Sequence, residues 1–109
     1  MMKEMNSQKQ EILAYLERIK SRPQFYVPEF ELVSLSILVD GFRLGCFAAL
    51  GDKVRSDYTE VFCDVVKERG WEMDTLHFLD QMSDSGLSPE HVFQEIMEIE
   101  IEVWKRLIW

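Results

Sequence analysis

Carboxylates at helical spacing are the side chains in this sequence with the clearest capacity for chemistry. Residues 70–104 contain nine aspartates and glutamates and no lysine or arginine, although the whole chain has 12 basic residues. Carboxylates can act as general acids or bases, bind metal ions or attract cationic surfaces. The net charge of −8 repels phosphate backbones. A basic protein is therefore a better candidate partner than nucleic acid.

The residues that catalysis usually needs are sparse. His77 and His91 are the two histidines, and neither lies in an HxxxH or HExxH motif. The chain has no GxSxG motif and no phosphate-binding glycine-rich loop. Asp40, Asp64 and Glu68 are possible metal ligands, but acids scattered on helices are more often solvated. We expect no enzyme, no cofactor and no metal site, and a metal-dependent hydrolase that uses carboxylates and a histidine stays as an alternative.

Size and composition point to one domain with one core, since the chain has 109 residues and 47% hydrophobic content. Cys46 and Cys63 lie in apolar helical patterns without CxxC spacing, which is typical of small buried residues in a reducing compartment. No apolar stretch follows Lys3, and no apolar run is long enough to span a membrane. We predict a cytoplasmic protein that does not bind membranes.

Helical periodicity runs through most of the chain and predicts about five helices. The expected ranges are 7–22, 31–50, 57–70, 74–85 and 88 to nearly the end. Pro23 ends the first helix, and residues 25–27 are expected as an extended connection pressed onto the core. Gly70 and Gly86 suit helix C-termini, while Ser88 and Pro89 suit a helix start. The sequence thus predicts an all-α bundle, with residues 1–109 as a single domain.

The helix expected at residues 31–50 is apolar on two sides, which is typical of a central helix. One stripe consists of Leu35, Leu38, Val39, Phe42, Cys46 and Leu50. The opposite stripe consists of Val33, Ile37, Leu44 and Phe47. Ser34, Gly41 and Gly45 lie on one flank and should let another helix approach closely. Such packing would offset the helix propensity that each glycine loses, about 1 kcal/mol.

The long C-terminal helix separates its residues onto two faces. Its apolar face is formed by Val92, Phe93, Ile96, Ile99, Val103, Trp104 and Leu107. Glu95, Glu98 and Glu102 line the opposite face together with His91, and like charges at this spacing oppose a helix by about 0.2–0.5 kcal/mol per pair. Glu100 falls on the apolar face, where an unpaired carboxylate is costly. We expect Arg43 or Arg22 beside it, or a bend in the helix.

The fourth helix should also have an acidic outer face. Its inward residues are expected to be Leu76, Phe78, Leu79 and Met82, and its outward residues His77, Asp80, Gln81 and Asp84. The predicted partner-binding residues are Glu72, Asp74, Asp80, Asp84, Glu95, Glu98 and Glu102. The alternative is a solvated acidic face that only maintains solubility. That alternative explains the total charge better than it explains 35 residues without a lysine.

A resemblance to a known family covers most of the chain. Residues 12–27 contain Arg22, Pro23 and Tyr26, and the helix after them contains the triplet Asp40-Gly41-Phe42. This pattern resembles small bacterial immunity proteins of polymorphic toxin and contact-dependent growth inhibition systems. Those proteins have a helix, an Arg-Pro-x-x-Tyr turn and a helix with an aspartate-glycine-aromatic triplet. A phenylalanine-rich helix, a Gly-Trp pair and a long final helix follow.

The resemblance implies a cytoplasmic, non-enzymatic inhibitor that binds one toxin domain, commonly an RNase or DNase, and covers its active site. Nucleases present cationic surfaces, so an acidic face would mimic the nucleic-acid backbone. We expect the Arg-Pro-x-x-Tyr turn to hold the first two helices together rather than to touch the toxin. Before complex formation such a protein would be a monomer or a weak homodimer. The alternative function is an adaptor or regulator that self-associates through an apolar patch around Trp109.

Overall fold

The computed structural model describes residues 2–26, 32–72 and 78–107. Within these ranges it contains α-helices, one short 3₁₀ turn and no strand, so the predicted all-α fold is confirmed. The helices are α1 (Met2–Ser21), α2 (Leu32–Leu50), α3 (Asp52–Glu68), α4 (Phe78–Asp84) and α5 (Pro89–Arg106), and the 3₁₀ turn is η1 (Pro23–Phe25). None of the described helices combines the length and apolar character that crossing a membrane requires.

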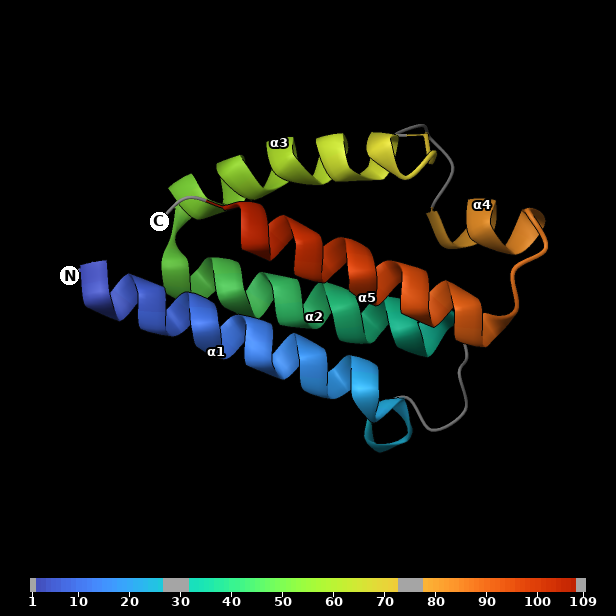
Figure 1. Ribbon diagram of the computed structural model, residues 1–109, viewed down its shortest axis with the longest axis horizontal. Coiled ribbons are helices and arrows are strands. Elements are labelled where there is room, and N and C mark those ends of the chain that lie inside the picture. The colour runs from blue at the N-terminus through green and yellow to red at the C-terminus, as the bar shows by residue number, and fades with distance from the viewer. Residues whose placement is uncertain (1, 27–31, 73–77, 108–109) are drawn as a thin grey trace.

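Helix α5 is the centre of the bundle (Figure 1). Helices α1 and α3 pack against it in the antiparallel direction, α2 lies behind it, and α4 packs near its start. The prediction that residues 31–50 form the central helix is wrong, because Ile37 and Leu44 of α2 are 67% and 59% exposed. The second apolar stripe of α2 thus faces outward over part of its length. Buried residues occur on several sides of α5 instead: Val92, Phe93, Met97, Ile99, Glu100, Ile101, Val103 and Trp104.

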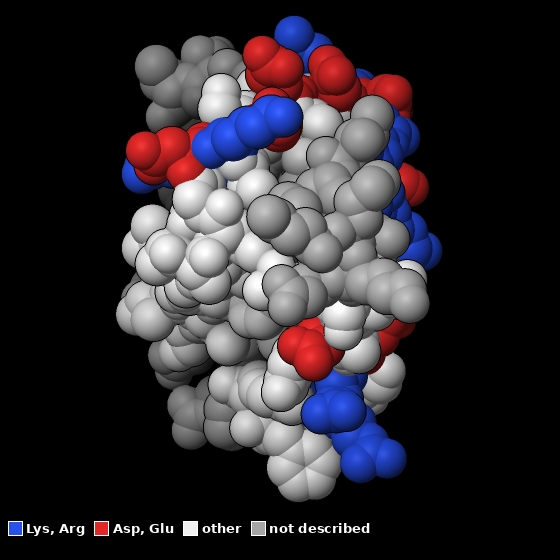
Figure 2. Space-filling view, turned by 90° about the vertical axis from the view of Figure 1, so that its left-hand side faces the viewer, with Lys and Arg blue, Asp and Glu red and all other residues white. Residues whose placement is uncertain are grey.

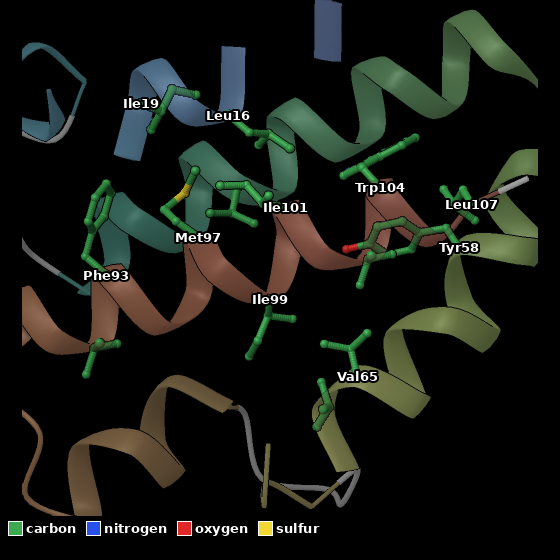
Figure 3. Packing of buried hydrophobic residues seen from close by; sticks show 14 of the residues in the cluster. Leu16, Ile19, Tyr58, Val65, Phe93, Met97, Ile99, Ile101, Trp104 and Leu107 are labelled. Carbon is green, nitrogen blue, oxygen red and sulfur yellow. The ribbon is translucent and has the colours of Figure 1, made fainter. Parts of the chain in front are cut away.

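The core gathers around the side chains of α5 (Figure 3). Phe93 and Trp104 of α5 are completely buried, as are Val66 of α3 and Met82 of α4. Near the end of α5 the Trp104 ring lies 5.5 Å from the ring of Tyr58. Complete burial of a large apolar side chain contributes about 1.5–3 kcal/mol. The C-terminal helix therefore supplies much of the stability of the fold.

Glycines end α3 and α4 as predicted. Gly70 and Gly86 have φ values of 87° and 94°, a conformation that residues with a Cβ rarely adopt. After each glycine the next N–H reaches back over the helix end, from Trp71 to the carbonyl of Val66 at 3.0 Å and from Leu87 to that of Met82 at 3.3 Å. These are Schellman caps, and they satisfy carbonyl groups that a helix leaves open at its C-terminus.

Both ends of α5 are capped by side chains. At its start the Oγ of Ser88 accepts a hydrogen bond from the N–H of His91 at 3.3 Å, with Pro89 in the first turn as predicted. At its end the Nζ of Lys9 donates to the carbonyls of Lys105 and Leu107, at 3.0 and 2.6 Å. A cation is favourable there because the C-terminus of a helix carries partial negative charge. Lys9 thereby fastens α1 to α5.

Two predicted helix starts are wrong. Helix α1 begins at Met2 rather than residue 7, in a segment rich in good helix formers. Helix α3 begins at Asp52 rather than residue 57, directly after Gly51 with its φ of 98°. The extra turn of α3 places Val54 one turn before Tyr58 on the buried face, so tertiary packing extends the helix. Residues 74–77 of the predicted fourth helix, including Leu76 and His77, lie outside the described residues.

The connection after α1 also differs from the prediction. Pro23–Phe25 form a 3₁₀ turn, in which the N–H of Tyr26 donates to the carbonyl of Pro23 at 2.9 Å. Phe25 is 72% exposed and Tyr26 41% exposed, so neither is pressed onto the core as expected. The fixed φ of proline suits the first position of such a turn.

Candidate interaction surface

Three of the predicted partner-binding residues form an exposed group that we name the α4 acidic patch: Glu72, Asp80 and Asp84. Asp80 and Asp84 are four residues apart and share one face of α4. The side-chain amide of Gln81 holds the backbone of Glu72, donating to its carbonyl at 2.9 Å and accepting from its N–H at 3.2 Å. Gln81, expected to point outward, is therefore half-buried and brings Glu72 next to α4.

The α4 acidic patch keeps its charge unpaired within the described part of the chain. The ion pairs found there are formed by Lys20, Arg43, Arg69 and Arg106, and their acidic partners are other carboxylates: Asp40, Glu68, Glu95, Glu98, Glu100 and Glu102. Asp74, the fourth predicted residue of this region, lies outside the described residues. Unpaired surface carboxylates retain their full electrostatic attraction for an approaching cationic partner.

An open depression of about 410 Å³ borders the α4 acidic patch. Its lining includes the half-buried side chains of Trp71 and Leu87, which stand next to Glu72 and Gly86 in the chain, and the exposed side chain of His91. The indole Nε1 of Trp71 donates a hydrogen bond to Glu95 at 2.8 Å, which fixes the ring in place. The depression thus offers a rigid aromatic surface beside three carboxylates.

The acidic stripe of α5 is paired with bases from other helices. The Nε of Arg69, at the end of α3, donates to Glu95 at 3.1 Å, and its Nη2 lies 2.6 Å from Glu98. The Nζ of Lys20, from α1, lies 3.7 Å from the second oxygen of Glu98. Both bases lie outside the lysine-free segment, so the fold neutralises much of the charge that the sequence concentrates there. The role of Glu95 and Glu98 in partner binding stays a prediction.

Glu102 belongs to a second ion-pair group. The Nε of Arg106 lies 3.6 Å from Glu102, and its Nη2 lies 2.6 Å from Glu68 of α3. Hydrogen bonding from Arg106 lowers the pKa of Glu68. Together with Lys20 and Arg69, these residues line a groove of about 300 Å³ between α1, α3 and α5 that carries both signs of charge. Exposed pairs of this kind contribute little stability, because water and salt screen the attraction between the charges.

The pairing of Glu95 should make stability depend on acid pH. The hydrogen bond from Arg69 lowers the pKa of Glu95 and outweighs the opposing effect of burial, and Trp71 lowers that pKa further. A lowered pKa contributes stability that is present above the unfolded value, about 4.3, and is lost as the pH falls through the folded value. We expect Arg69→Met to lower the free energy of unfolding at pH 7 by at most about 1 kcal/mol.

Urea denaturation of Arg69→Met and of the original chain at a series of pH values measures this effect. The difference between the two should shrink as the pH falls below about 4. Lys67→Met, which removes a neighbouring exposed cation of α3, is the matched control and should leave the pH profile unchanged. A difference that stays constant down to pH 3, about one unit below the ordinary glutamate pKa, would contradict the assignment.

Glu100 lies buried on α5 and pairs with Arg43 of α2, which confirms the first of the two expected partners. The hydroxyl of Tyr58 donates to the same carboxylate, and the Nε1 of Trp104 donates to it at 3.3 Å. The guanidinium of Arg43 lies 5.0 Å from the ring of Tyr58 and 5.1 Å from that of Phe62. These contacts join α2, α3 and α5, so the cluster supports the fold.

The two titratable partners of Glu100, Arg43 and Tyr58, keep their protons at neutral pH. Burial raises the pKa of Tyr58 well above its ordinary value, and the charge of Glu100 raises it further. Burial lowers the pKa of Arg43, but the charge of Glu100, the hydrogen bond to Glu100 and the charge of Asp40 outweigh that effect and leave the pKa of Arg43 raised. The sequence did not indicate Tyr58 or Trp104 as partners, because each lies in an apolar pattern that suits a core residue equally well.

The remaining candidates for chemistry do not converge within the described residues. No three of their histidine, cysteine, aspartate and glutamate side chains are placed to hold a metal ion together. Cys46 and Cys63 are free and half-buried, and burial raises the pKa of Cys46 to about 11, so little of its reactive thiolate exists at neutral pH. Trp109, the centre of the alternative apolar patch, lies outside the described residues.

Comparisons with protein-family models, with curated proteins and with solved structures find no match to this chain. Its function is therefore inferred from charge and geometry. The α4 acidic patch and the depression beside it combine unpaired charge with a fixed aromatic side chain.

Proposed function

We propose that the chain is an immunity protein that binds and neutralises a basic toxin domain, in the commonest case a nuclease. The observation that carries the proposal is the α4 acidic patch, three exposed carboxylates that no described lysine or arginine pairs with. A nuclease active site needs cations to hold phosphates. A group of carboxylates held on a folded surface suits those cations and raises the rate of encounter.

The α4 acidic patch is a better centre for the interface than the stripe of α5. Glu95 and Glu98 already receive hydrogen bonds from Arg69, so a toxin arginine would have to displace an internal one. Asp80 and Asp84 require no such exchange. Of the predicted partner-binding residues, Glu72, Asp80 and Asp84 would form the contact. Glu95 and Glu98 line the depression beside it, whereas Glu102 lies in the groove between α1, α3 and α5.

Charge and apolar contact would make different contributions to binding. The α4 acidic patch attracts the toxin and sets its orientation, as complementary charges do at other interfaces. Trp71 and Leu87, in the adjoining depression, would then bury apolar surface and slow dissociation, because tryptophan is prominent among residues that dominate binding energy. The active site of the toxin would be blocked once its cationic side chains pair with the carboxylates of the α4 acidic patch. The proposed inhibition takes place in the cytoplasm.

The test requires the partner, which we expect to be a small basic domain at the end of a large secreted protein encoded next to this chain. Expression of that domain alone should stop growth, and co-expression of this chain should restore it. With purified proteins, Asp80→Lys/Asp84→Lys should lower the association rate constant by about 10–100-fold at low ionic strength. Added salt should reduce the difference in association rate between this variant and the original chain.

A matched control comes from α3, where Glu60 and Asp64 are also exposed and four residues apart. Glu60→Lys/Asp64→Lys changes the net charge equally and should leave association within about threefold of the original, because long-range steering depends on where the charge lies. If the α3 and α4 double variants slowed association equally, the assignment of the interface to α4 would be contradicted. A larger effect of reversing Glu95, Glu98 and Glu102 than of reversing Asp80 and Asp84 would place the interface on α5 instead.

A further inference from the structure

Exposed aromatic and basic side chains gather where α1 ends and η1 follows. We name this surface the α1-end patch and define it by five exposed residues: Tyr15, Arg18, Arg22, Phe25 and Tyr26. It holds three of the five large hydrophobic side chains that are exposed in the described part of the chain, and Phe25, at 72%, is the most exposed of them. Aromatic and arginine side chains are enriched in protein interfaces, so this patch has the composition of one.

The two arginines of the α1-end patch are unpaired. None of the ion pairs within the described residues includes Arg18 or Arg22. The guanidinium of Arg18 lies 5.4 Å from the centre of the Tyr15 ring, and Tyr15, Arg18 and Arg22 share one face of α1. Glu17 lies about 100° around the helix from Arg18, and Glu11 borders the patch one turn before Tyr15. The α1-end patch is therefore basic, although the chain as a whole is acidic.

Part of this patch is the Arg-Pro-x-x-Tyr turn, which we expected to hold the first two helices together. Arg22 is exposed and Tyr26 is 41% exposed, so packing against the described helices leaves both side chains accessible. The proposed inhibition depends on carboxylates and gives the turn no role. Its arginine and its aromatic side chains are thus free to contact a different partner.

The other two exposed hydrophobic side chains, Ile37 and Leu44, lie on α2. A Cβ added to Gly41 or Gly45 would meet no atom within 4 Å, so the predicted close approach of another helix of the same chain is wrong. Nothing on this face of α2 indicates a particular partner. The two cations of the α1-end patch, by contrast, select an acidic one.

The molecule itself carries a surface that complements the α1-end patch. The α4 acidic patch supplies three unpaired carboxylates, and the depression of about 410 Å³ beside it is lined in part by Trp71 and Leu87. Arginines pair well with carboxylates, often through two parallel hydrogen bonds. The protruding ring of Phe25 suits the depression, because aromatic rings pack favourably against each other. The two surfaces therefore match in both charge and shape.

The two surfaces lie at the same end of the bundle (Figure 1). Helix α1 is antiparallel to α5, so its last turn and η1 are near the start of α5, where α4 also packs. A twofold axis at this end lets the α1-end patch of each copy contact the α4 acidic patch of the other. The contact then forms twice, and the pair is closed.

We infer that two copies of the chain form an end-to-end homodimer in which the α1-end patch of each copy covers the α4 acidic patch of the other. The dimer itself does not depend on a toxin. Its consequence for inhibition rests on the proposed function: a toxin domain that binds the α4 acidic patch competes with the second copy, so toxin binding separates the dimer.

The distribution of charge is consistent with this partner. Figure 2 shows basic side chains gathered at the lower edge of the molecule, on the side of α1, while most of the acidic side chains in view lie near the upper edge, on the side of α3. A long phosphate backbone would be repelled by the net charge of −8. The same net charge opposes the meeting of two copies, so the local attraction has to exceed it and the dimer should be weak.

Sedimentation velocity of the full chain, from about 1 µM to about 1 mM, tests the inference. We expect a monomer–dimer equilibrium whose Kd rises at least about tenfold in Arg18→Glu/Arg22→Glu and at least about threefold in Phe25→Ala. Lys53→Glu/Lys67→Glu reverses two exposed cations of α3 and changes the net charge equally. This matched control should leave the Kd within about threefold of the original.

A charge exchange between the two surfaces makes the test independent of folding defects. Asp80→Lys/Asp84→Lys alone should also raise the Kd at least about tenfold. When this variant is mixed with Arg18→Glu/Arg22→Glu, each reversed surface meets an oppositely charged one at both contacts, so a heterodimer should form with a Kd near that of the original homodimer. Loss of folding in either variant cannot produce such a recovery.

Three results would overturn the inference: a chain that stays monomeric over the whole range, no recovery when the two variants are mixed, or an effect of the α3 control equal to that of Arg18→Glu/Arg22→Glu. The proposed inhibition fails separately. Arg18→Glu/Arg22→Glu should lose the dimer and still bind the toxin domain, because its α4 acidic patch is unchanged.

Discussion

Glu100→Ala is expected to lower the free energy of unfolding by about 3–5 kcal/mol, the cost of removing one partner of a buried ion pair. The Glu100 side chain is only 2% exposed and accepts hydrogen bonds from Arg43, Tyr58 and Trp104. Without it, the half-buried guanidinium of Arg43 and the buried donors of Tyr58 and Trp104 lose this acceptor. Urea denaturation followed by circular dichroism measures the loss.

A second variant keeps this prediction testable if Glu100→Ala fails to fold. Arg43→Met/Glu100→Met removes both charges and retains most of the side-chain volume, and such replacements often cost little. We expect it to be more stable than Glu100→Ala but less stable than the original, because Tyr58 and Trp104 still lack their acceptor. Glu102→Ala is the control, because this glutamate lies two residues further along α5 and its side chain is 38% exposed. We expect it to change the free energy of unfolding by at most about 0.5 kcal/mol. Equal losses in Glu100→Ala and Glu102→Ala would contradict the structural role of the buried cluster.

Trp104→Ala is expected to be the most damaging apolar substitution, with a loss of about 3–5 kcal/mol. The Trp104 side chain is completely buried, and its ring lies 5.5 Å from that of Tyr58 and 6.4 Å from that of Phe47. Truncation leaves a cavity where α2, α3 and α5 meet and also removes a donor to Glu100. Because domains of this size have total stabilities of about 5–15 kcal/mol, the variant should be close to unfolding at 25 °C.

Trp104→Phe separates the cost of the cavity from the cost of the lost hydrogen bond to Glu100. It retains most of the ring volume and removes the indole donor, so its loss should be about 1.5–3 kcal/mol. Phe25→Ala truncates an aromatic side chain that is 72% exposed and should change stability by at most about 0.5 kcal/mol. If Trp104→Ala cost no more than Phe25→Ala, the ring would not belong to the core, and the packing at this end of the bundle would have to be redrawn.

Local patterns predicted several features correctly. The N-cap at Ser88 and the glycine ends of α3 and α4 depend on backbone geometry within a few residues, so sequence motifs are enough to recognise them. Glu100 is an instructive case, because a carboxylate on an apolar face must have a cation, and Arg43 was one of two candidates. The start of α3 was harder, since burial of Val54 extends the helix beyond its best local signal.

The ion pairs of the acidic surface could not be predicted from the sequence. Periodicity assigns each residue to a face of its own helix, and this was sufficient to separate Glu100 from the stripe of Glu95, Glu98 and Glu102. It says nothing of what another helix brings to that face. Arg69 pairs with Glu95 from 26 residues away, and Lys20 with Glu98 from 78 residues away along the chain. The sequence therefore established an all-α chain with a concentrated negative charge, whereas three-dimensional packing made α5 the central helix and left the α4 acidic patch unpaired. The physical reason is that helix formation and capping are local, while burial and ion pairing depend on which helices come into contact.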